Sequence, residues 1–361
     1  MEDILYDYWF CNIGGVGNVT RNKLLDEFGS TKMVYEANNM QLEKYLKPAV
    51  LQAFLESKNE DKIALKYEDL IKQGIKFVSY FSEEYPTNLR NIYDYPYGLY
   101  FKGNMTDFKR KTVAIVGARD CTNYGYEMAK YIGEELSGRG INVVSGMAKG
   151  VDRAAHVGCL KGTGAALAVL GCGVDICYPR ENIDIYMEIQ KRGAIISEYP
   201  PGSKPLAGYF PVRNRIISGM ADAVIIIEAR EKSGSLITID QALEQGREVF
   251  ALPGRFTDSL SKGTNELIKN GANIITDMQD IFDFLGANLQ DFEEKNKKIN
   301  ISLAKNEKMV YSCLDLLPKN LNDIFKECQL DYDEIHEAII ELIIKGLAVE
   351  TSKNYYAKTM E

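Results

Sequence analysis

The sequence lacks the glycine-rich motifs of the common nucleotide-binding folds. The turn after the first core strand, residues 117–122, reads Gly-Ala-Arg-Asp-Cys-Thr and misses the second and third glycines of the Gly-x-Gly-x-x-Gly motif that binds NAD or FAD. No Gly-x-x-x-x-Gly-Lys-Ser/Thr motif occurs either. The sequence therefore argues against dinucleotide cofactors and against P-loop ATP chemistry.

Other absences bear on location and on metals. No apolar run approaches the length of a membrane span, and the start of the chain, with Glu2, Asp3 and Asp7, lacks the basic region of a secretory signal. The 7 cysteines are odd in number and scattered, and no Cys-x-x-Cys pair occurs. That usage is typical of reduced thiols in the cytoplasm rather than of disulfides or a zinc site. We expect a cytoplasmic protein without a membrane partner, a metal or a cofactor.

The charge of the chain is unevenly distributed. The 361 residues, long enough for two or three domains, carry a formal net charge of −8. Residues 1–105 and 300–361 are net acidic, whereas positive and negative charges balance over 109–286. Screening keeps electric fields local, so a basic groove on the middle segment can still bind phosphates.

Strands and helices alternate over the middle of the chain. Short β-branched or apolar runs end in small-residue turns and are separated by helical stretches of a length that suits right-handed crossovers. Such alternation predicts an α/β fold with a parallel sheet. The expected strands are 112–116, 141–144, 165–170, 194–196, 223–227, 248–251 and 273–275.

The turns at the carboxyl ends of these strands form the candidate site. Residues 224–227 are four consecutive β-branched residues, typical of a strand buried on both faces. The turn Ser233-Gly234-Ser235 follows it and opens a helix whose free N–H groups favour an anion. Arg119, Gly146 and the Gly171-Cys172-Gly173 turn stand at other strand ends. One phosphate needs one such turn, and a row of turns suits an extended polyanion.

A cationic segment lies just before the buried strand. Between Tyr199 and Ala221 there is no acidic residue, while Lys204, Arg213 and Arg215 are basic. The two arginines could form structural ion pairs, but the acid-free run favours phosphate contacts. Phe210, in the same segment, is a candidate for stacking on a base. No nucleophile with a general base stands out. Asp152 and His156, four residues apart, are interpreted as a structural hydrogen-bonding pair.

The N-terminal 70 residues are expected to be helical. Residues 13–21 resemble a helix-hairpin-helix motif, which binds the DNA backbone without reading sequence, although a tight packing turn explains the same glycines. Residues 75–103 are dense in aromatic side chains, which could stack on bases but are more often packed between domains.

The C-terminal region reads as a separate module. Residues 287–300 are polar and are interpreted as a linker. Residues 301–361 predict three helices followed by a β-hairpin, the plan of a winged helix. Its third helix carries Asp331, Asp333, Glu334, Glu337 and Glu341, which would repel phosphate. A protein-contact or regulatory role is therefore favoured over DNA reading.

Taken in order, the core motifs resemble the DNA-processing protein A (DprA/Smf) family. The resemblance extends over the whole middle segment. It rests on the runs at 116–119, 145–152, 168–175, 197–202, 210–217, 233–235 and 246–250.

This resemblance implies an extended Rossmann-like core, between a helical N-terminal domain at 1–70 and a winged-helix-like domain at 301–361, with the core at 71–286. It implies a sequence-independent single-stranded DNA-binding protein of natural transformation, and no enzyme. Such a protein dimerises through the core, protects incoming strands and loads the RecA recombinase onto them. Asp120 departs from the plainer polar run usual in the first turn. The implied DNA contacts are Arg119, Gly146, Lys204, Phe210, Arg213, Asn214, Arg215, Ser233, Gly234 and Ser235.

Two other functions stay open. The core resembles, more distantly, the lysine-decarboxylase-like phosphoribohydrolases, which carry a Gly-Gly-x-Gly-Thr turn followed by a glutamate. Here residues 233–238 keep part of that turn, but Asp240 follows in place of the glutamate. Alternatively, the acidic C-terminal module could make the protein an adaptor.

Overall fold

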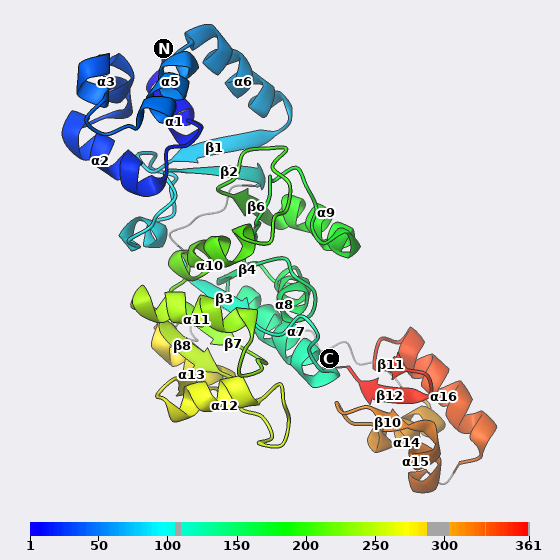
Figure 1. Cartoon of the computed structure of the whole chain (residues 1–361). Coiled ribbons are helices and arrows are strands. Elements are labelled where there is room, and N and C mark those ends of the chain that lie inside the picture. The colour runs from blue at the N-terminus through cyan, green and yellow to red at the C-terminus, as the bar shows by residue number, and fades with distance from the viewer. Residues whose placement is uncertain (105–109, 287–302, 329, 360–361) are drawn as a thin grey trace.

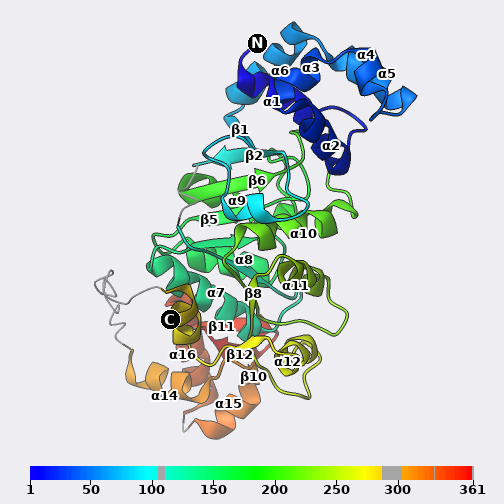
Figure 2. The same cartoon turned by 90° about the vertical axis from the view of Figure 1, so that its left-hand side faces the viewer.

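The computed structural model describes residues 1–104, 110–286, 303–328 and 330–359 in three successive parts (Figure 1). N-terminal helices sit at one end of a large sheet, and a small C-terminal module lies beside the other end (Figures 1 and 2). The linker expected at 287–300 lies outside the described residues. In the described chain no helix is both long and apolar enough to cross a membrane. All seven cysteines are free.

The N-terminal part is helical, as its sequence indicates. Its core is aromatic: the ring of Trp9 lies 4.8 Å from that of Tyr35 and 5.1 Å from that of Phe54, both edge-on. Such edge-to-face pairs add to the hydrophobic stabilisation of a small core. The helices are α1 (Asp3–Cys11), α2 (Asn18–Phe28), α3 (Thr31–Glu36), α4 (Asn39–Leu42), α5 (Pro48–Ser57) and α6 (Glu60–Lys72).

The middle part is built on a nine-stranded sheet with the order β1-β2-β6-β5-β4-β3-β7-β8-β9. The seven expected strands are present and pair in parallel, so the predicted α/β parallel core is confirmed. They are β3 (Thr112–Val116), β4 (Asn142–Ser145), β5 (Ala166–Val169), β6 (Gly193–Ser197), β7 (Ala223–Ile226), β8 (Glu248–Ala251) and β9 (Asn273–Ile274).

Helices cover both faces of this sheet, because successive strand side chains point to opposite faces. Val113 and Ile115 belong to the apolar cluster that includes α7, α8, α9 and α13, whereas Ala114 and Val116 pack with α10 and α11. The helices are α7 (Asn123–Gly138), α8 (Val151–Cys159), α9 (Ile183–Arg192), α10 (Tyr209–Met220), α11 (Gly234–Glu244), α12 (Lys262–Lys269) and α13 (Met278–Leu285). Short 3-10 turns lie at Asn88–Asn91 and Arg180–Asn182.

The aromatic segment before the parallel core forms two further strands that the sequence did not predict. β1 (Ile75–Ser79) pairs with β2 (Gly98–Gly103), which continues the sheet beside β6, and both pairings are antiparallel. Tyr85 and Tyr100 are fully buried, and the ring of Tyr97 packs edge-on against that of Phe10 in α1. Phe77, Tyr97 and Tyr100 therefore join the N-terminal helices to the sheet, in line with the favoured interpretation that aromatic residues here pack between domains.

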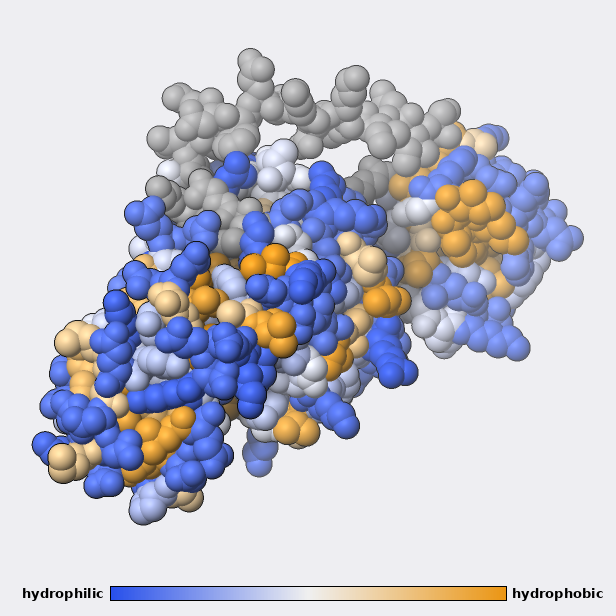
Figure 3. Space-filling model, turned by 90° about the horizontal axis from the view of Figure 1, so that it is seen from above, coloured by the Kyte–Doolittle hydropathy of each residue, from blue (hydrophilic) through white to orange (hydrophobic). Residues whose placement is uncertain are grey.

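The C-terminal module contains the helices and the hairpin expected there. Its elements are α14 (Lys305–Cys313), β10 (Lys319–Asn320), α15 (Leu321–Glu327), α16 (Tyr332–Ile344), β11 (Ala348–Ser352) and β12 (Tyr355–Lys358). The module contacts the core through the side-chain amide of Asn123, which donates to the carbonyls of Leu316 and Lys358. Figure 3 shows an apolar cluster ringed by hydrophilic residues on its surface.

Candidate nucleic-acid interface

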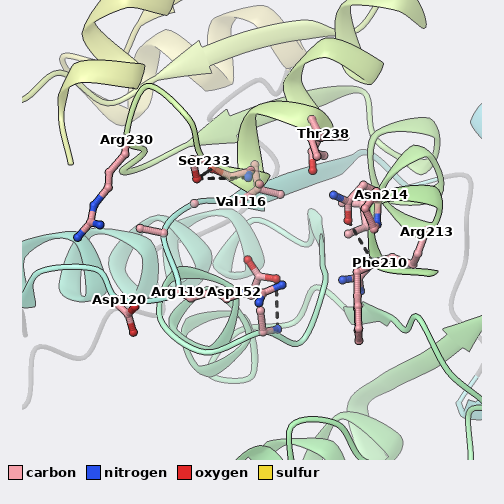
Figure 4. A pocket seen from close by; sticks show the side chains of 18 of the residues that line it. Val116, Arg119, Asp120, Asp152, Phe210, Arg213, Asn214, Arg230, Ser233 and Thr238 are labelled. Atoms are coloured by element: carbon pink, nitrogen blue, oxygen red, sulfur yellow. Dashed lines mark hydrogen bonds between the residues drawn. The ribbon is translucent and has the colours of Figure 1, made fainter. Parts of the chain in front are cut away.

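The parallel sheet grows to both sides of its first strand, β3. The chain adds β4, β5 and β6 on one side and then β7, β8 and β9 on the other, which creates a crevice at one edge of the sheet. β3 has β4 on one side and β7 on the other, and a ligand site is expected where the strand order reverses in this way. A cavity of about 750 Å³ lies there. In Figure 4 the turn at Ser233 and Thr238 lie on one side of it, Arg119, Asp120 and Asp152 on the other, and α10 closes one end.

The turn that carries Arg119 is held by a buried carboxylate. Glu228, at the end of β7, accepts hydrogen bonds from the backbone N–H of Thr122 (2.8 Å) and from its hydroxyl (2.6 Å). Gly125 is required beside it, because a Cβ there would come within 2.5 Å of the carboxyl carbon of Glu228. Glu228 thereby fixes the start of α7 and anchors the turn that precedes this helix. Arg119, in the same turn, is exposed to solvent.

Exposed cations rim the cavity without carboxylate partners. Arg119, Arg230 and Lys232 line it, are exposed and form no ion pair within the described part of the chain. A cation that has no internal partner keeps its full charge for an external anion. Lys204 is exposed on the loop before α10, next to Pro205, which lines the cavity, so it flanks the cavity rather than lining it.

The turn before α11 supplies neutral anion-binding groups. The hydroxyl of Ser233 caps the helix by accepting from the N–H of Ser235, and the two hydroxyl oxygens lie 2.8 Å apart. Nothing lies within 4 Å of a Cβ placed at Gly234, so the backbone there is open to a ligand. All three residues line the cavity at the start of α11, where the positive end of the helix dipole favours an anion.

Phe210 lies at the start of α10, on the rim of the same cavity. Its ring packs over Gly171, in the turn after β5. A Cβ at position 171 would come within 2.9 Å of the ring, so this position requires glycine. The ring of Tyr178 lies 5.4 Å away with an angle of 31° between the two planes. Tyr178 also lines the cavity, and the two rings give it an aromatic side.

Arg213 lines the cavity from inside the fold. Its side chain is buried and donates to the carbonyls of Gly146 and Val169 and to the side-chain oxygen of Asn214. Burial lowers the pKa of Arg213 to about 10, so it remains charged at neutral pH. It contributes positive charge to the cavity, together with a structural role that the sequence did not indicate. Asn214 also lines the cavity.

Arg215 takes the alternative role that the sequence left open. Its guanidinium binds both carboxylate oxygens of Glu198, at 2.8 and 2.9 Å, and that of Asp94 at 2.9 Å. It is buried and does not line the cavity. Two residues that stand two positions apart on an α-helix point in different directions, so Arg213 and Arg215 cannot both line one groove. This geometry gives Arg215 a structural ion pair in place of the predicted phosphate contact.

Gly146 is also not free to bind a phosphate through its N–H. The side chain of Asp152 accepts from the N–H of Gly146 (3.1 Å) and from that of Ala148 (3.2 Å). Burial raises the pKa of the Asp152 carboxyl, although the nearby charge of Arg213 and these two amides act against it. The turn after β4 thus already contains its own anion, and Gly146 only lines a side cavity of about 100 Å³.

The structure also contradicts the pairing of Asp152 with His156. Both ring nitrogens of His156 are buried without a hydrogen-bond partner in the described structure. Burial first, and then the charge of Arg213, lower the pKa of His156 from 6.5 to about 3. The histidine is therefore a neutral core residue.

Acid should destabilise the protein through His156. The unfolded chain takes up this proton near pH 6.5 and the folded protein does not, so stability is complete above that pH and falls as the pH decreases. Between about pH 7.5 and about pH 5.5 this term should remove about 1.4 kcal/mol from the free energy of unfolding. Urea unfolding of wild type and His156→Leu measures it. The leucine variant should lack this term, and the exposed His336→Leu variant should keep it.

Asp120 is an exposed acid in the lining of a site otherwise rimmed by cations. It should weaken the binding of any anion there. Asp120→Asn is expected to tighten binding of an oligonucleotide about two- to fivefold at low salt, because one exposed charge contributes little and is screened by salt. Fluorescence anisotropy at two salt concentrations tests this. An Asp120→Asn affinity equal to that of wild type at low salt would place bound phosphates away from this turn.

The N-terminal hairpin packs against the core rather than presenting a free anion site. The side chain of Asn18, at the start of α2, donates to the carboxylate of Asp94 at 2.9 Å. Arg21 turns inward and donates to the carbonyls of Phe10 and Cys11. A carboxylate of the core thus lies beside the start of α2, bound to the Asn18 side chain, and this geometry favours the packing alternative.

The structure therefore brings seven of the ten predicted residues to one cavity. Arg213 is among them but buried, Lys204 flanks the cavity, Gly146 lines the side cavity and Arg215 lies elsewhere. Sequence reasoning missed Tyr178, Arg230 and Lys232. All three follow strand ends, which was the available signal, but nothing in the sequence indicates that their turns approach one another.

Comparison with known proteins places this geometry in a family. Residues 76–286 match the family model of DNA recombination-mediator protein A. The chain is 43% identical over 215 residues to DNA processing protein DprA of Bacillus subtilis, covering 59% of this chain and 72% of that one. It is 34% identical over 288 residues to protein Smf of Synechocystis, covering 78% and 72% of the two chains.

Solved structures agree. The crystal structure of DNA processing protein A from Streptococcus pneumoniae matches with a TM-score of 0.68 and 34% identity, covering 81% of this chain and 99% of that one. A structure of DNA processing protein A from Helicobacter pylori, described for its single-stranded DNA binding mode, matches with a TM-score of 0.53 and 32% identity, covering 61% and 97%. The chain belongs to the DNA recombination-mediator protein A (DprA/Smf) family.

Proposed function

We propose that this protein binds single-stranded DNA without sequence preference through the cavity at the carboxyl edge of its sheet. The observation that carries the proposal is the group of exposed cations Arg119, Arg230 and Lys232 around a helix start, with no carboxylate paired to them in the described chain. Cations and helix-start amides bind phosphates, which every nucleotide carries.

The aromatic side of the cavity favours single strands over duplexes. A duplex keeps its bases stacked on one another, whereas a single strand can place a base against Phe210 and Tyr178. Backbone groups that could read base edges already form hydrogen bonds within the protein. The backbone N–H groups of Gly146 and Ala148, for example, both donate to the carboxylate of Asp152. The site therefore offers charge and stacking more than base-specific hydrogen bonds.

Family membership supports a wider role. The Helicobacter pylori relative is described for binding single-stranded DNA. We propose that this protein, in the cytoplasm, protects incoming single strands during natural transformation, loads RecA onto them and acts as a homodimer through its core. The C-terminal module would contribute protein contacts or regulation, because α16 exposes the acids Asp333, Glu337 and Glu341.

Binding of a 5′-labelled oligonucleotide, single-stranded and annealed to its complement, at about 50 mM and 200 mM salt tests the proposal. Single strands should bind more tightly, and their affinity should fall between the two salt concentrations, because phosphate contacts release counterions. Tighter binding of the duplex, or affinity independent of salt, would contradict it.

The alternative is a nucleotide-processing enzyme related to the phosphoribohydrolases. One observation favours it: Ser233 and Thr238, which keep part of the nucleotide-binding turn, both line the cavity. Asp240, where those enzymes carry a glutamate, is exposed and absent from the lining. Nucleoside monophosphates incubated with the protein should release no free base, and catalytic release would establish the enzyme instead.

A further inference from the structure

The C-terminal module contains two cysteines whose sulfur atoms are in contact. Cys313 is the last residue of α14, and Cys328 directly follows α15. The two helices lie side by side (Figures 1 and 2), and the Sγ atoms of the two cysteines are 3.0 Å apart. In the described chain no other two cysteines are hydrogen-bonded to each other through their sulfur atoms. One covalent bond can therefore join this pair without a large movement of the backbone.

A lysine holds together the two chain segments that carry these thiols. The Nζ of Lys319 donates to the carbonyl of Cys313 at 2.6 Å and to the carboxylate of Glu327, the neighbour of Cys328, at 2.7 Å. The Sγ of Cys328 also lies 3.8 Å from the carbonyl oxygen of Met309, one helical turn before Cys313. The contact between the thiols is therefore supported by the chain on both sides of it.

The two thiols differ in their access to solvent. Cys313 is half-buried, whereas Cys328 is 7% exposed and packs in the apolar core of the module. Burial raises the pKa of the Cys328 thiol to about 12, and its hydrogen bond with Cys313 acts in the same direction. Cys328 therefore stays a thiol at neutral pH, and an oxidant that arrives from solvent meets Cys313 first.

We propose that Cys313 and Cys328 are a modification site, at which a peroxide produces a disulfide within the C-terminal module. The peroxide transfers one oxygen to the sulfur of Cys313, its O–O bond breaks, and a sulfenic acid forms as one water leaves. The sulfur of Cys328 then attacks that of Cys313: the S–S bond forms, the S–O bond breaks, and the hydroxyl leaves as a second water with the proton of Cys328. The two electrons that the thiols lose reduce the peroxide.

The bond closes the segment through which the module meets the core. Cys313 and Cys328 are 15 positions apart in the sequence, and Leu316 between them accepts a hydrogen bond from Asn123, at the start of α7 (3.1 Å). A disulfide stabilises a fold mainly because it restricts the unfolded chain. We expect the bond to suppress local opening of α15. No residue of the module lines the cavity at the edge of the sheet, so this inference does not depend on the proposed function.

The test uses the full chain, first reduced and then treated with an equimolar amount of hydrogen peroxide. After the remaining thiols are alkylated, trypsin releases residues 309–319, which carry Cys313, and residues 327–345, which carry Cys328. Mass spectrometry should find these two peptides joined, lighter by the hydrogen atoms of the two thiols. Alkylation should count two thiols fewer than the seven of the reduced protein. Dithiothreitol should restore the separate peptides.

A second readout measures the effect on the fold. Trypsin can cut after Lys326, in α15, when this helix opens locally. The cut should be at least about fivefold slower in the oxidised protein, because a disulfide that closes a loop of this length typically contributes more than that factor.

Single substitutions assign both readouts to the pair. Cys328→Ser should give neither the joined peptides nor the slower cut, and dimedone should label a sulfenic acid on its Cys313. Cys313→Ser should give neither effect and no such label. Cys11→Ser removes a half-buried thiol of α1, far from the pair in the sequence, and should behave as wild type in both readouts.

Three results would contradict the inference. After peroxide treatment, separate peptides with seven free thiols would show that the pair does not react. A dimer on a gel run without reductant, with the two peptides joined between copies, would place the bond between chains. A bond within the chain that leaves the cut after Lys326 unchanged would overturn the effect on α15. None of these readouts involves DNA, so each leaves the proposed function to its own test.

Discussion

Replacing Arg119 by glutamate should weaken binding of single-stranded DNA by at least about tenfold, because a hydrogen bond to a charged group contributes about 1.5–3 kcal/mol and each 1.4 kcal/mol is a factor of ten. The reversed charge adds repulsion to that loss. Arg119 is exposed, lines the cavity and has no ion-pair partner in the described structure, so its loss should not affect folding. Fluorescence anisotropy with a labelled oligonucleotide measures the change.

Lys66→Glu is the matched control for this reversal. Lys66 is exposed on α6, in the N-terminal part, and its change alters net charge by the same amount. It should cost less than about twofold, because screening confines the effect of an exposed charge to its surroundings. An Arg119→Glu variant that is folded and binds single-stranded DNA as tightly as Lys66→Glu would show that the strand does not bind in the cavity.

Replacing Arg215 by alanine should produce the largest loss of stability, about 3–5 kcal/mol, because it leaves a buried carboxylate without its partner. Glu198, its bidentate partner, is itself mostly buried, with a side chain that is 19% exposed. The same cluster reaches the N-terminal part through Asp94 and Asn18. The loss should therefore also loosen the contact between that part and the core.

Urea unfolding measures the stability of Arg215→Ala, and anisotropy at low temperature measures its DNA affinity. The double variant Arg215→Met with Glu198→Gln should recover part of the stability, since no unpaired buried charge remains. The folded single variant should bind DNA within about threefold of wild type, because the cost belongs to the buried pair rather than to a phosphate contact. A stable Arg215→Ala protein with greatly weakened binding would restore the phosphate contact that the geometry rejects.

The parallel core could be predicted because its signal is local. Runs such as 112–116 and 223–227 are buried on both faces and read as apolar strands, and each ends in a small-residue turn. β1 and β2 were not predicted because the aromatic residues in and around them have two roles. They form strands of the sheet, and they also pack against the N-terminal helices. Composition alone does not separate these roles.

The sequence indicated the edge of the sheet where the cavity lies, and it indicated only some of the residues that line the cavity. Strand-end turns identified Arg119 and Ser233–Ser235, because the edge on which a parallel strand ends follows from topology. The roles of Arg213 and Arg215 could not be read, since Asp94 and Val169 lie far away in the sequence and Glu198 stands just before the acid-free run. An acid-free run shows that no acid is near in the sequence, and says nothing about acids brought near by folding.

The most direct test of the central claim is the slope of log affinity against log salt for wild type, Arg119→Ala and the double variant Arg119→Ala with Lys232→Ala. If these exposed cations each bind a phosphate of a single strand, the slope should become shallower by about 0.7 with each cation removed. Three parallel lines, with affinity lost equally at every salt concentration, would show that the cations bind no phosphate and would contradict the account.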